Sequence, residues 1–201
     1  MSDPKIINLP KIIAVSKTFK IDKILPLINY GHIDFGENKI QEAVDKWTEI
    51  KLNNSKIKLH MIGKLQTNKV KFAVKLFDYI HSVDNKKLAQ KIADEQKKVN
   101  RKIKIFIQVN IGDEEQKSGV KKTEVSDLIL YCKKINLDVA GLMCLPPADD
   151  QSSSYFKEMN LLNSSFSLSE LSMGMSSDYI EATKNFATYL RIGSSIFGER
   201  I

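Results

Sequence analysis

The chain has 201 residues, of which 42% are hydrophobic and 27% charged, and its net charge is +7. This is an ordinary globular composition with enough apolar material for one core, and no apolar stretch approaches the roughly 18 residues of a membrane span. The lysines near 86–91 and 97–104 follow amphipathic helical patterns without interleaved aromatic residues. The positive charge therefore predicts attraction of small phosphate-bearing anions, and neither specific nucleic-acid binding nor membrane contact is expected.

The termini and cysteines predict a cytoplasmic protein. Residues 1–5 lack the positively charged and apolar regions of a signal peptide. Cys132 and Cys144 fall in a predicted helix and a predicted strand, without CxxC spacing. They are interpreted as free thiols in a reducing compartment and not as a disulfide or metal site.

Short apolar runs alternate with helical patterns along the whole chain. Strands are predicted at 12–16, 33–36, 58–62, 79–83, 103–109, 138–144, 169–173 and 189–192. Helices are predicted near 20–30, 38–51, 67–77, 85–99, 121–135, 152–164 and 177–186. This alternation predicts parallel βαβ units, and eight strands favour a (β/α)8 TIM-type barrel over an open doubly wound sheet. Without a linker or an internal repeat, residues 1–201 are expected to form a single α/β domain.

Lys17 follows the apolar run at 12–15, at the end of the first predicted strand. The carboxyl ends of barrel strands carry the chemistry of this fold, so its amine is expected at the rim, half desolvated. Partial burial disfavours the ammonium form and leaves more free amine to attack a carbonyl carbon, as in a Schiff-base lysine. A lysine that simply marks the return of the chain to solvent is the alternative.

The loops after the seventh and eighth strands, 172–178 (SMGMSSD) and 191–198 (RIGSSIFG), combine glycine and serine ahead of a predicted helical turn. Barrel phosphate sites favour these two loops. Their backbone N–H groups, serine hydroxyls and helix dipoles favour an anion, although ordinary capped turns would have the same composition. Two such loops opposite a rim lysine favour a phosphate-bearing ligand.

A series of motifs resembles one known family in order and spacing, from about residue 12 to the end of the chain. The motifs are AVSKT at 14–18, FGEN at 35–38, HMIGKLQTNK at 60–69, SVD at 82–84, QVN at 108–110, KSG at 117–119, GLMC at 141–144, LSMGMS at 171–176, RIGS at 191–194 and IFG at 196–198. On these motifs the chain resembles the pyridoxal phosphate homeostasis protein family. That family is related to the N-terminal barrel of alanine racemase.

The resemblance implies a barrel of the fold-type III class that binds pyridoxal 5′-phosphate (PLP). It implies an internal aldimine of PLP on Lys17. It also implies phosphate contacts at Ser176, Gly193 and Ser194, with backbone help from Met175.

Two further positions acquire a role through the resemblance. Arg191 is implied to face the pyridine nitrogen, and Asn38 to neighbour the cofactor ring; without the resemblance, Arg191 would suit a salt bridge at a barrel end. His60, Met143 and Lys64 belong to motifs around the mouth of the barrel and receive no role.

The function expected is that of a carrier rather than an enzyme. A guanidinium donates to the pyridine nitrogen without leaving it cationic, which makes the ring a weak electron sink. A racemase also needs a second acid/base, which fold-type III racemases take from a separate domain, and this chain ends at Ile201. We therefore expect PLP to be held and delivered to apo PLP-dependent enzymes in vitamin B6 homeostasis, the alternative being a slow amino-acid racemase.

Three departures from the family pattern affect stability more than binding. Only residues 1–11 precede the first strand, where the family carries a helix; this shortened N-terminal helical region leaves the outer layer of the barrel thin, which would expose an apolar stripe or favour self-association. A monomer or a weak homodimer is expected. Phe186 stands where the family commonly has glycine, so its turn is expected to avoid positive φ. Ser194 replaces the more frequent threonine and keeps the hydroxyl.

Overall fold

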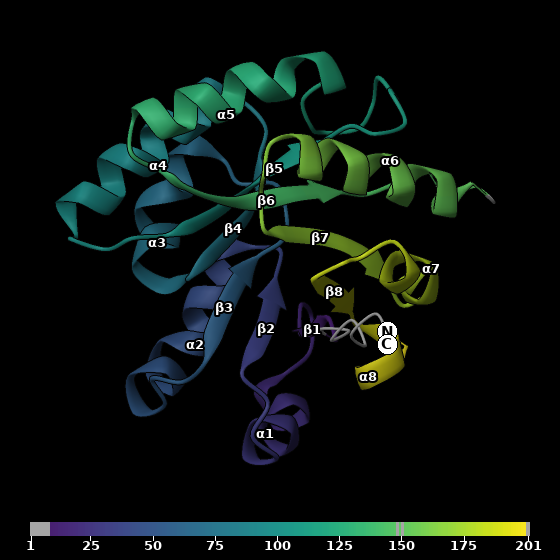
Figure 1. The fold of residues 1–201 in the computed structure, drawn as a ribbon. Helices are drawn as coiled ribbons and strands as arrows, with labels where there is room; N and C mark the ends of the chain where they lie inside the picture. The colour runs from purple at the N-terminus through teal and green to yellow at the C-terminus, as the bar shows by residue number, and fades with distance from the viewer. Residues whose placement is uncertain (1–8, 148, 150, 200–201) are drawn as a thin grey trace, which may run out of the picture.

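The strands of the protein close into a parallel barrel. The computed structural model describes residues 9–147, 149 and 151–199 (Figure 1). Eight strands pair in chain order and β8 pairs with β1. They are β1 (Lys11–Val15), β2 (Asp34–Glu37), β3 (Lys58–Met61), β4 (Tyr79–Val83), β5 (Lys104–Val109), β6 (Asp138–Cys144), β7 (Glu170–Met175) and β8 (Tyr189–Ile192). The predicted (β/α)8 TIM-type barrel is confirmed.

Helices connect the strands on the outside of the barrel (Figure 1). They are α1 (Ile21–Asn29), α2 (Ile40–Asn53), α3 (Val70–Leu76), α4 (Lys86–Lys98), α5 (Val125–Lys134), α6 (Ser152–Ser165), α7 (Tyr179–Lys184) and α8 (Ser194–Phe197). Single 3₁₀ turns, η1 (Thr67–Lys69) and η2 (Lys122–Glu124), lead into α3 and α5. None of the described helices is long and apolar enough to cross a membrane. The N-terminal segment 1–8, on which the shortened N-terminal region was predicted, lies outside the described residues.

Two apolar clusters stabilise the barrel. The larger lies between strands and helices and includes Phe35 and Trp47, whose ring centroids are 4.8 Å apart. The smaller lies inside the barrel and includes Phe106 and Tyr189. Because these rings fill the interior, the barrel is a packed core and not a pore.

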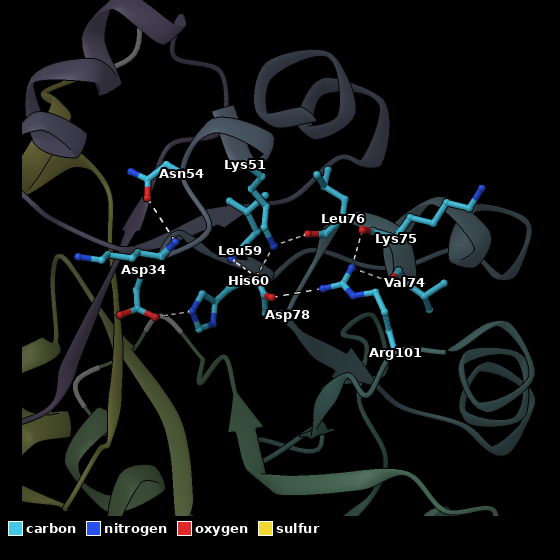
Figure 2. Close-up of polar contacts among 11 residues, drawn as sticks. Asp34, Lys51, Asn54, Leu59, His60, Val74, Lys75, Leu76, Asp78 and Arg101 are labelled. Atoms are coloured by element: carbon cyan, nitrogen blue, oxygen red, sulfur yellow. Dashed lines mark hydrogen bonds and ion pairs between the residues drawn. The ribbon is translucent and has the colours of Figure 1, made fainter. Parts of the chain in front are cut away.

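At the opposite end of the barrel from the strands' carboxyl ends, Asp78 joins several elements (Figure 2). Its carboxylate accepts from Lys51 Nζ of α2 at 2.5 Å, from the backbone N–H of Leu59 at 2.9 Å and from Arg101 Nη2 at 3.3 Å. Burial lowers the pKa of Lys51, and Asp78 opposes that shift. This ion cluster lies at the amino end of the barrel and joins strand and helix ends there.

The turn after α7 differs from its prediction. Phe186 has φ +65°, so the expectation that this turn avoids positive φ is wrong. At the end of the helix, the Phe186 N–H donates to Thr183 O at 3.1 Å and the Ala187 N–H donates to Ala182 O at 3.0 Å. This pattern of helix termination requires a residue in the left-handed conformation. Asn100 and Asn136 take the same conformation after α4 and α5. The geometry of the helix end thus overrides the preference of a bulky side chain.

We expect the Phe186→Gly variant to be more stable than the parent protein by about 1 kcal/mol, because a left-handed residue with a Cβ is strained. The Phe186 side chain is 67% exposed, so little buried area is lost. Urea unfolding measures the difference. Asn136→Gly is the matched control and should change the free energy of unfolding by a few tenths of a kcal/mol only. A Phe186→Gly variant no more stable than this control would contradict the strain argument.

Candidate functional site

A cavity of about 540 Å³ opens at the carboxyl ends of strands β1, β7 and β8. This volume lies within the range of small-molecule sites. The cavity is lined by Val15, Lys17, Phe19, Ile62, Leu145, Met175, Ser176, Ser177, Arg191, Gly193, Ser194, Gly198 and Glu199. The lining brings together six of the seven residues predicted from the sequence.

Asn38 is the predicted residue that does not line the cavity. It directly follows β2 and packs on Gly63, where an added Cβ would lie 2.7 Å from the Asn38 Cα atom. Its Oδ1 atom is buried and has no hydrogen-bond partner. The structure therefore places an unsatisfied acceptor near the rim, behind the lining.

Lys17 lies just beyond β1 and is half-buried, as predicted. The backbone on each side of it is held by neighbouring elements. Ser16 N–H donates to Gly36 O at 3.0 Å, and Thr18 N–H donates to Glu42 Oε1 at 2.5 Å. Thr18 has φ +69°, an uncommon conformation for a β-branched residue, which turns the chain out of the strand directly after Lys17.

Lys46 and Glu37 belong to a hydrogen-bonded cluster that holds the backbone next to Lys17. Lys46 Nζ donates to Ser16 O and to Glu37 Oε1, both at 2.9 Å, and to Glu42 Oε1 at 3.0 Å. The Glu37 side chain is fully buried and also accepts from Trp47 Nε1 at 2.9 Å. A charged and hydrogen-bonded cluster thus fixes the backbone that carries Lys17.

The loop after β7 depends on Gly174. This residue has φ +90°, and an added Cβ would lie 2.5 Å from the Ala182 Cβ atom, so only glycine fits the turn. The turn carries Met175 and Ser176 to the cavity. The Met175 N–H donates to Asp178 Oδ1 at 2.6 Å, so the backbone donor assigned to Met175 by resemblance is already paired within the protein.

The loop after β8 meets the β7 loop at the cavity. Gly193 N–H donates to Ser176 Oγ at 3.3 Å. Gly193 has φ −119°, and an added Cβ would make an ordinary contact with Val15 at 3.4 Å. Neither the backbone nor the packing requires glycine here, which fits a position where a ligand approaches the main chain.

Arg191 extends from β8 and is only 4% exposed. Its Nη1 donates to Ser172 Oγ at 2.7 Å and its Nη2 to the Cys144 carbonyl at 2.8 Å. Burial lowers the pKa of Arg191, and Asp178 opposes this shift through space. The guanidinium keeps further N–H donors for the cavity that it lines.

The motif residues expected around the mouth lie in different places. His60 and Met143 are fully buried inside the barrel, while Lys64 is exposed. The expected position is therefore wrong for His60 and Met143. His60 is a polar residue in its strand and Met143 lies in the apolar run GLMC, so the sequence does not show that either side chain points into the barrel.

Phe19, Leu145 and Glu199 line the cavity without having been predicted as site residues. Leu145 directly follows β6, and the rule that barrel sites form at the carboxyl ends of strands could have found it. Phe19 and Glu199 carry no comparable signal in the sequence.

Comparison with known proteins places the chain in a family. Residues 5–201 match the family model for the alanine racemase N-terminal domain. The pyridoxal phosphate homeostasis protein of Pasteurella multocida is 34% identical over 94% of this chain and 86% of its own length. That of Aquifex aeolicus is 36% identical over 96% of this chain and 88% of its own length. The chain belongs to the pyridoxal phosphate homeostasis protein family.

Solved structures agree with membership of the pyridoxal phosphate homeostasis protein family. PipY of Synechococcus elongatus with PLP bound superposes with a TM-score of 0.88 at 30% identity, covering 94% of this chain and 92% of PipY. The alanine racemase of Clostridium difficile superposes with a TM-score of 0.73 at 17% identity, covering 95% of this chain and 53% of its own. The latter likeness concerns the fold alone, and it confirms the predicted fold-type III barrel.

Proposed function

We propose that this protein binds PLP covalently through Lys17 and acts in intracellular vitamin B6 homeostasis, holding the cofactor and delivering it to apo PLP-dependent enzymes. The observation that carries the proposal is the meeting of Lys17, Arg191 and the two glycine–serine loops in one cavity. Relatives with the name pyridoxal phosphate homeostasis protein, and PipY with PLP bound, support it.

The lining offers complementary groups for the phosphate and the ring nitrogen of PLP. The hydroxyls of Ser176 and Ser194 suit a phosphate, and Gly193, whose N–H is paired with Ser176 Oγ, leaves room for it beside the main chain. Arg191 suits the ring nitrogen, which is an acceptor. The buried Asn38 Oδ1 has no hydrogen-bond partner, and Asn38 packs on Gly63, which follows Ile62 of the lining.

Lys17 supplies the nucleophile. When bound, PLP would supply an aldehyde carbon as the electrophile, and Lys17 would hold it through a bond from Nζ, the aldehyde oxygen being released as water. The backbone hydrogen bonds of Ser16 and Thr18 hold this amine at the rim. A bound aldehyde is masked from other amines, which suits storage and delivery of a reactive compound.

Arg191 favours a carrier over an enzyme. Its guanidinium only donates, so it cannot stabilise a protonated pyridine nitrogen, and the ring stays a weak electron sink. In the part of the lining that the structure describes, the ionisable side chains are Lys17, Arg191 and Glu199. Racemisation needs an acid/base on each face of the substrate, and Glu199, the one carboxylate in this part of the lining, is exposed to solvent.

We expect the PLP-loaded protein to convert L-alanine to D-alanine no faster than free PLP at the same concentration. Chiral chromatography of the reaction mixture measures the conversion. A faster conversion that disappears in Lys17→Ala and in Glu199→Gln would contradict the carrier proposal and establish a racemase.

The phosphate assignment predicts weaker binding in a double variant. Ser176→Ala with Ser194→Ala should raise the dissociation constant of PLP about tenfold, because two hydroxyl donors to an anion are lost. Reaction of Lys17 with the aldehyde should persist at saturating PLP. Ser195→Ala is the matched control, since Ser195 is exposed and outside the lining. Equal PLP affinity in the double variant and the control would overturn the assignment.

A cytoplasmic location and the oligomeric state belong to the same proposal. Cys132 and Cys144 are unpaired and buried, and burial raises the pKa of the Cys144 thiol to about 12, which suits a reducing compartment. A monomer or weak homodimer stays a prediction, as do a single domain over residues 1–201 and the absence of specific nucleic-acid binding.

A further inference from the structure

A continuous series of hydrogen bonds crosses the barrel interior from the cavity to the amino end. Arg191 Nη1 lies 2.7 Å from Ser172 Oγ, and Ser172 Oγ lies 2.9 Å from His81 Nδ1. His81 Nε2 lies 3.0 Å from His60 Nδ1, and His60 Nε2 lies 2.9 Å from Asp34 Oδ1. Asp34 is the first residue of β2, and Figure 2 shows its carboxylate against the His60 ring. We call this series the interior chain.

With both histidines neutral, the donors and acceptors fix the direction of every bond. A guanidinium only donates and a carboxylate only accepts. His60 therefore donates from Nε2 to Asp34, and its bare Nδ1 accepts from His81 Nε2–H. The bare Nδ1 of His81 then accepts the hydroxyl proton of Ser172, whose oxygen accepts from Arg191. All bonds point from the positive to the negative end.

This assignment requires both histidines to be neutral. Burial lowers the pKa of His60 and of His81, and Arg191 lowers the latter further. Stacking fixes the two rings. The His60 and Tyr79 ring centroids are 4.3 Å apart, and those of His81 and Phe106 are 4.2 Å apart. Both imidazoles are fully buried, so their hydrogen bonds do not compete with bulk water.

The interior chain also explains how the buried positive charge of Arg191 is stabilised. Arg191 is buried, yet among the described residues no carboxylate forms an ion pair with it, and Asp178 acts on it only through space. A buried charge without a partner is costly, whereas aligned hydrogen bonds that end on an anion spread that charge. Asp34 is the anion at the far end.

We propose that Asp34 is the remote counter-charge of Arg191 and that His60, His81 and Ser172 are positioning residues that hold its guanidinium toward the ring nitrogen of PLP. The inference rests on the proposed function and adds to it. Ser172 must accept from Arg191 because His81 takes its proton, and His81 can do so only because Asp34 orders His60. The remaining N–H groups of Arg191 are thereby directed to the cavity.

The test compares two ligands in three variants. The ligands are PLP and its carbocyclic analogue, in which a C–H group replaces the ring nitrogen while aldehyde and phosphate remain. Ser172→Ala breaks the interior chain next to Arg191, and Asp34→Asn removes the charge at its far end. Ser82→Ala is the matched control, because Ser82 is another buried strand serine whose hydroxyl has no partner. Circular dichroism and thermal unfolding establish that each variant is folded.

We expect Ser172→Ala to raise the dissociation constant of PLP about tenfold and Asp34→Asn about threefold. The two variants should change the dissociation constant of the analogue less than about twofold. The control Ser82→Ala should change the dissociation constant of neither ligand. Equal weakening for the two ligands would show general structural damage and overturn the inference. An unchanged PLP affinity in Asp34→Asn would overturn the counter-charge role. A parent protein that binds neither ligand would contradict the proposed function itself.

Discussion

We expect the Lys17→Ala variant to form no borohydride-stable adduct with PLP and to bind it about a hundredfold more weakly than the parent protein. Borohydride reduces the C=N bond to a stable amine, so trapping requires the Lys17 amine. The lost covalent bond corresponds to about 2.8 kcal/mol at this ratio. Weak binding should remain, because the loops at Ser176 and Ser194 are untouched.

The measurement is the mass of the reduced protein together with equilibrium dialysis of PLP. Lys64→Ala is the control, since Lys64 belongs to a neighbouring motif but is exposed and outside the cavity. It should give an adduct in the same yield as the parent. Undiminished trapping in Lys17→Ala would show that another lysine carries the cofactor.

Stability should fall steeply when the pH drops below about 6.5. Burial lowers the pKa of His60 and His81 in the folded state, while both titrate near 6.5 when unfolded. At His60, Asp34 and Asp78 raise the pKa and so oppose the effect of burial, whereas Lys11 lowers the pKa further. At His81, the pKa is lowered further by His60 and Arg191. Below pH 6.5 the unfolded chain therefore binds more protons than the folded one, and the free energy of unfolding decreases as pH falls.

Each histidine contributes a slope of up to about 1.4 kcal/mol per pH unit, and the full stability is present above pH 6.5. Urea unfolding between about pH 7 and pH 5 measures the slope, above the range where carboxylates titrate. His81→Gln should reduce it by about half. His32→Gln is the control and should leave it unchanged, since His32 lies outside the interior chain. A free energy of unfolding that does not change with pH, or a slope that disappears in His32→Gln, would contradict the conclusion that His60 and His81 are neutral in the folded protein.

The order of elements could be predicted because strand and helix signals are local. All eight strands, including the β-branched β5, lie within two residues of their predicted bounds. The 3₁₀ turns η1 and η2 were not predicted, since short turns differ little from helix starts in sequence. The left-handed Phe186 was missed because helix termination, a property of the backbone, decided its conformation.

The cavity could be predicted from strand ends, but the barrel interior could not. Lys17 lies two residues beyond β1 and Arg191 is the last but one residue of β8, which places both near one rim. His60 and His81 are 21 residues apart, and their contact depends on the register of β3 and β4. The strand sequences KLHM and YIHSV do not show which residue of one strand pairs with which residue of the other. Asn38 lies one residue beyond β2 and outside the lining, where it packs on Gly63.

The most direct test of the account is the visible absorption spectrum of the protein with PLP, before and after borohydride, followed by peptide mapping. The account predicts a yellow protein whose visible band is lost on reduction, with the reduced adduct on the peptide that contains Lys17. A protein that stays colourless with added PLP, or an adduct on a different lysine, would contradict it.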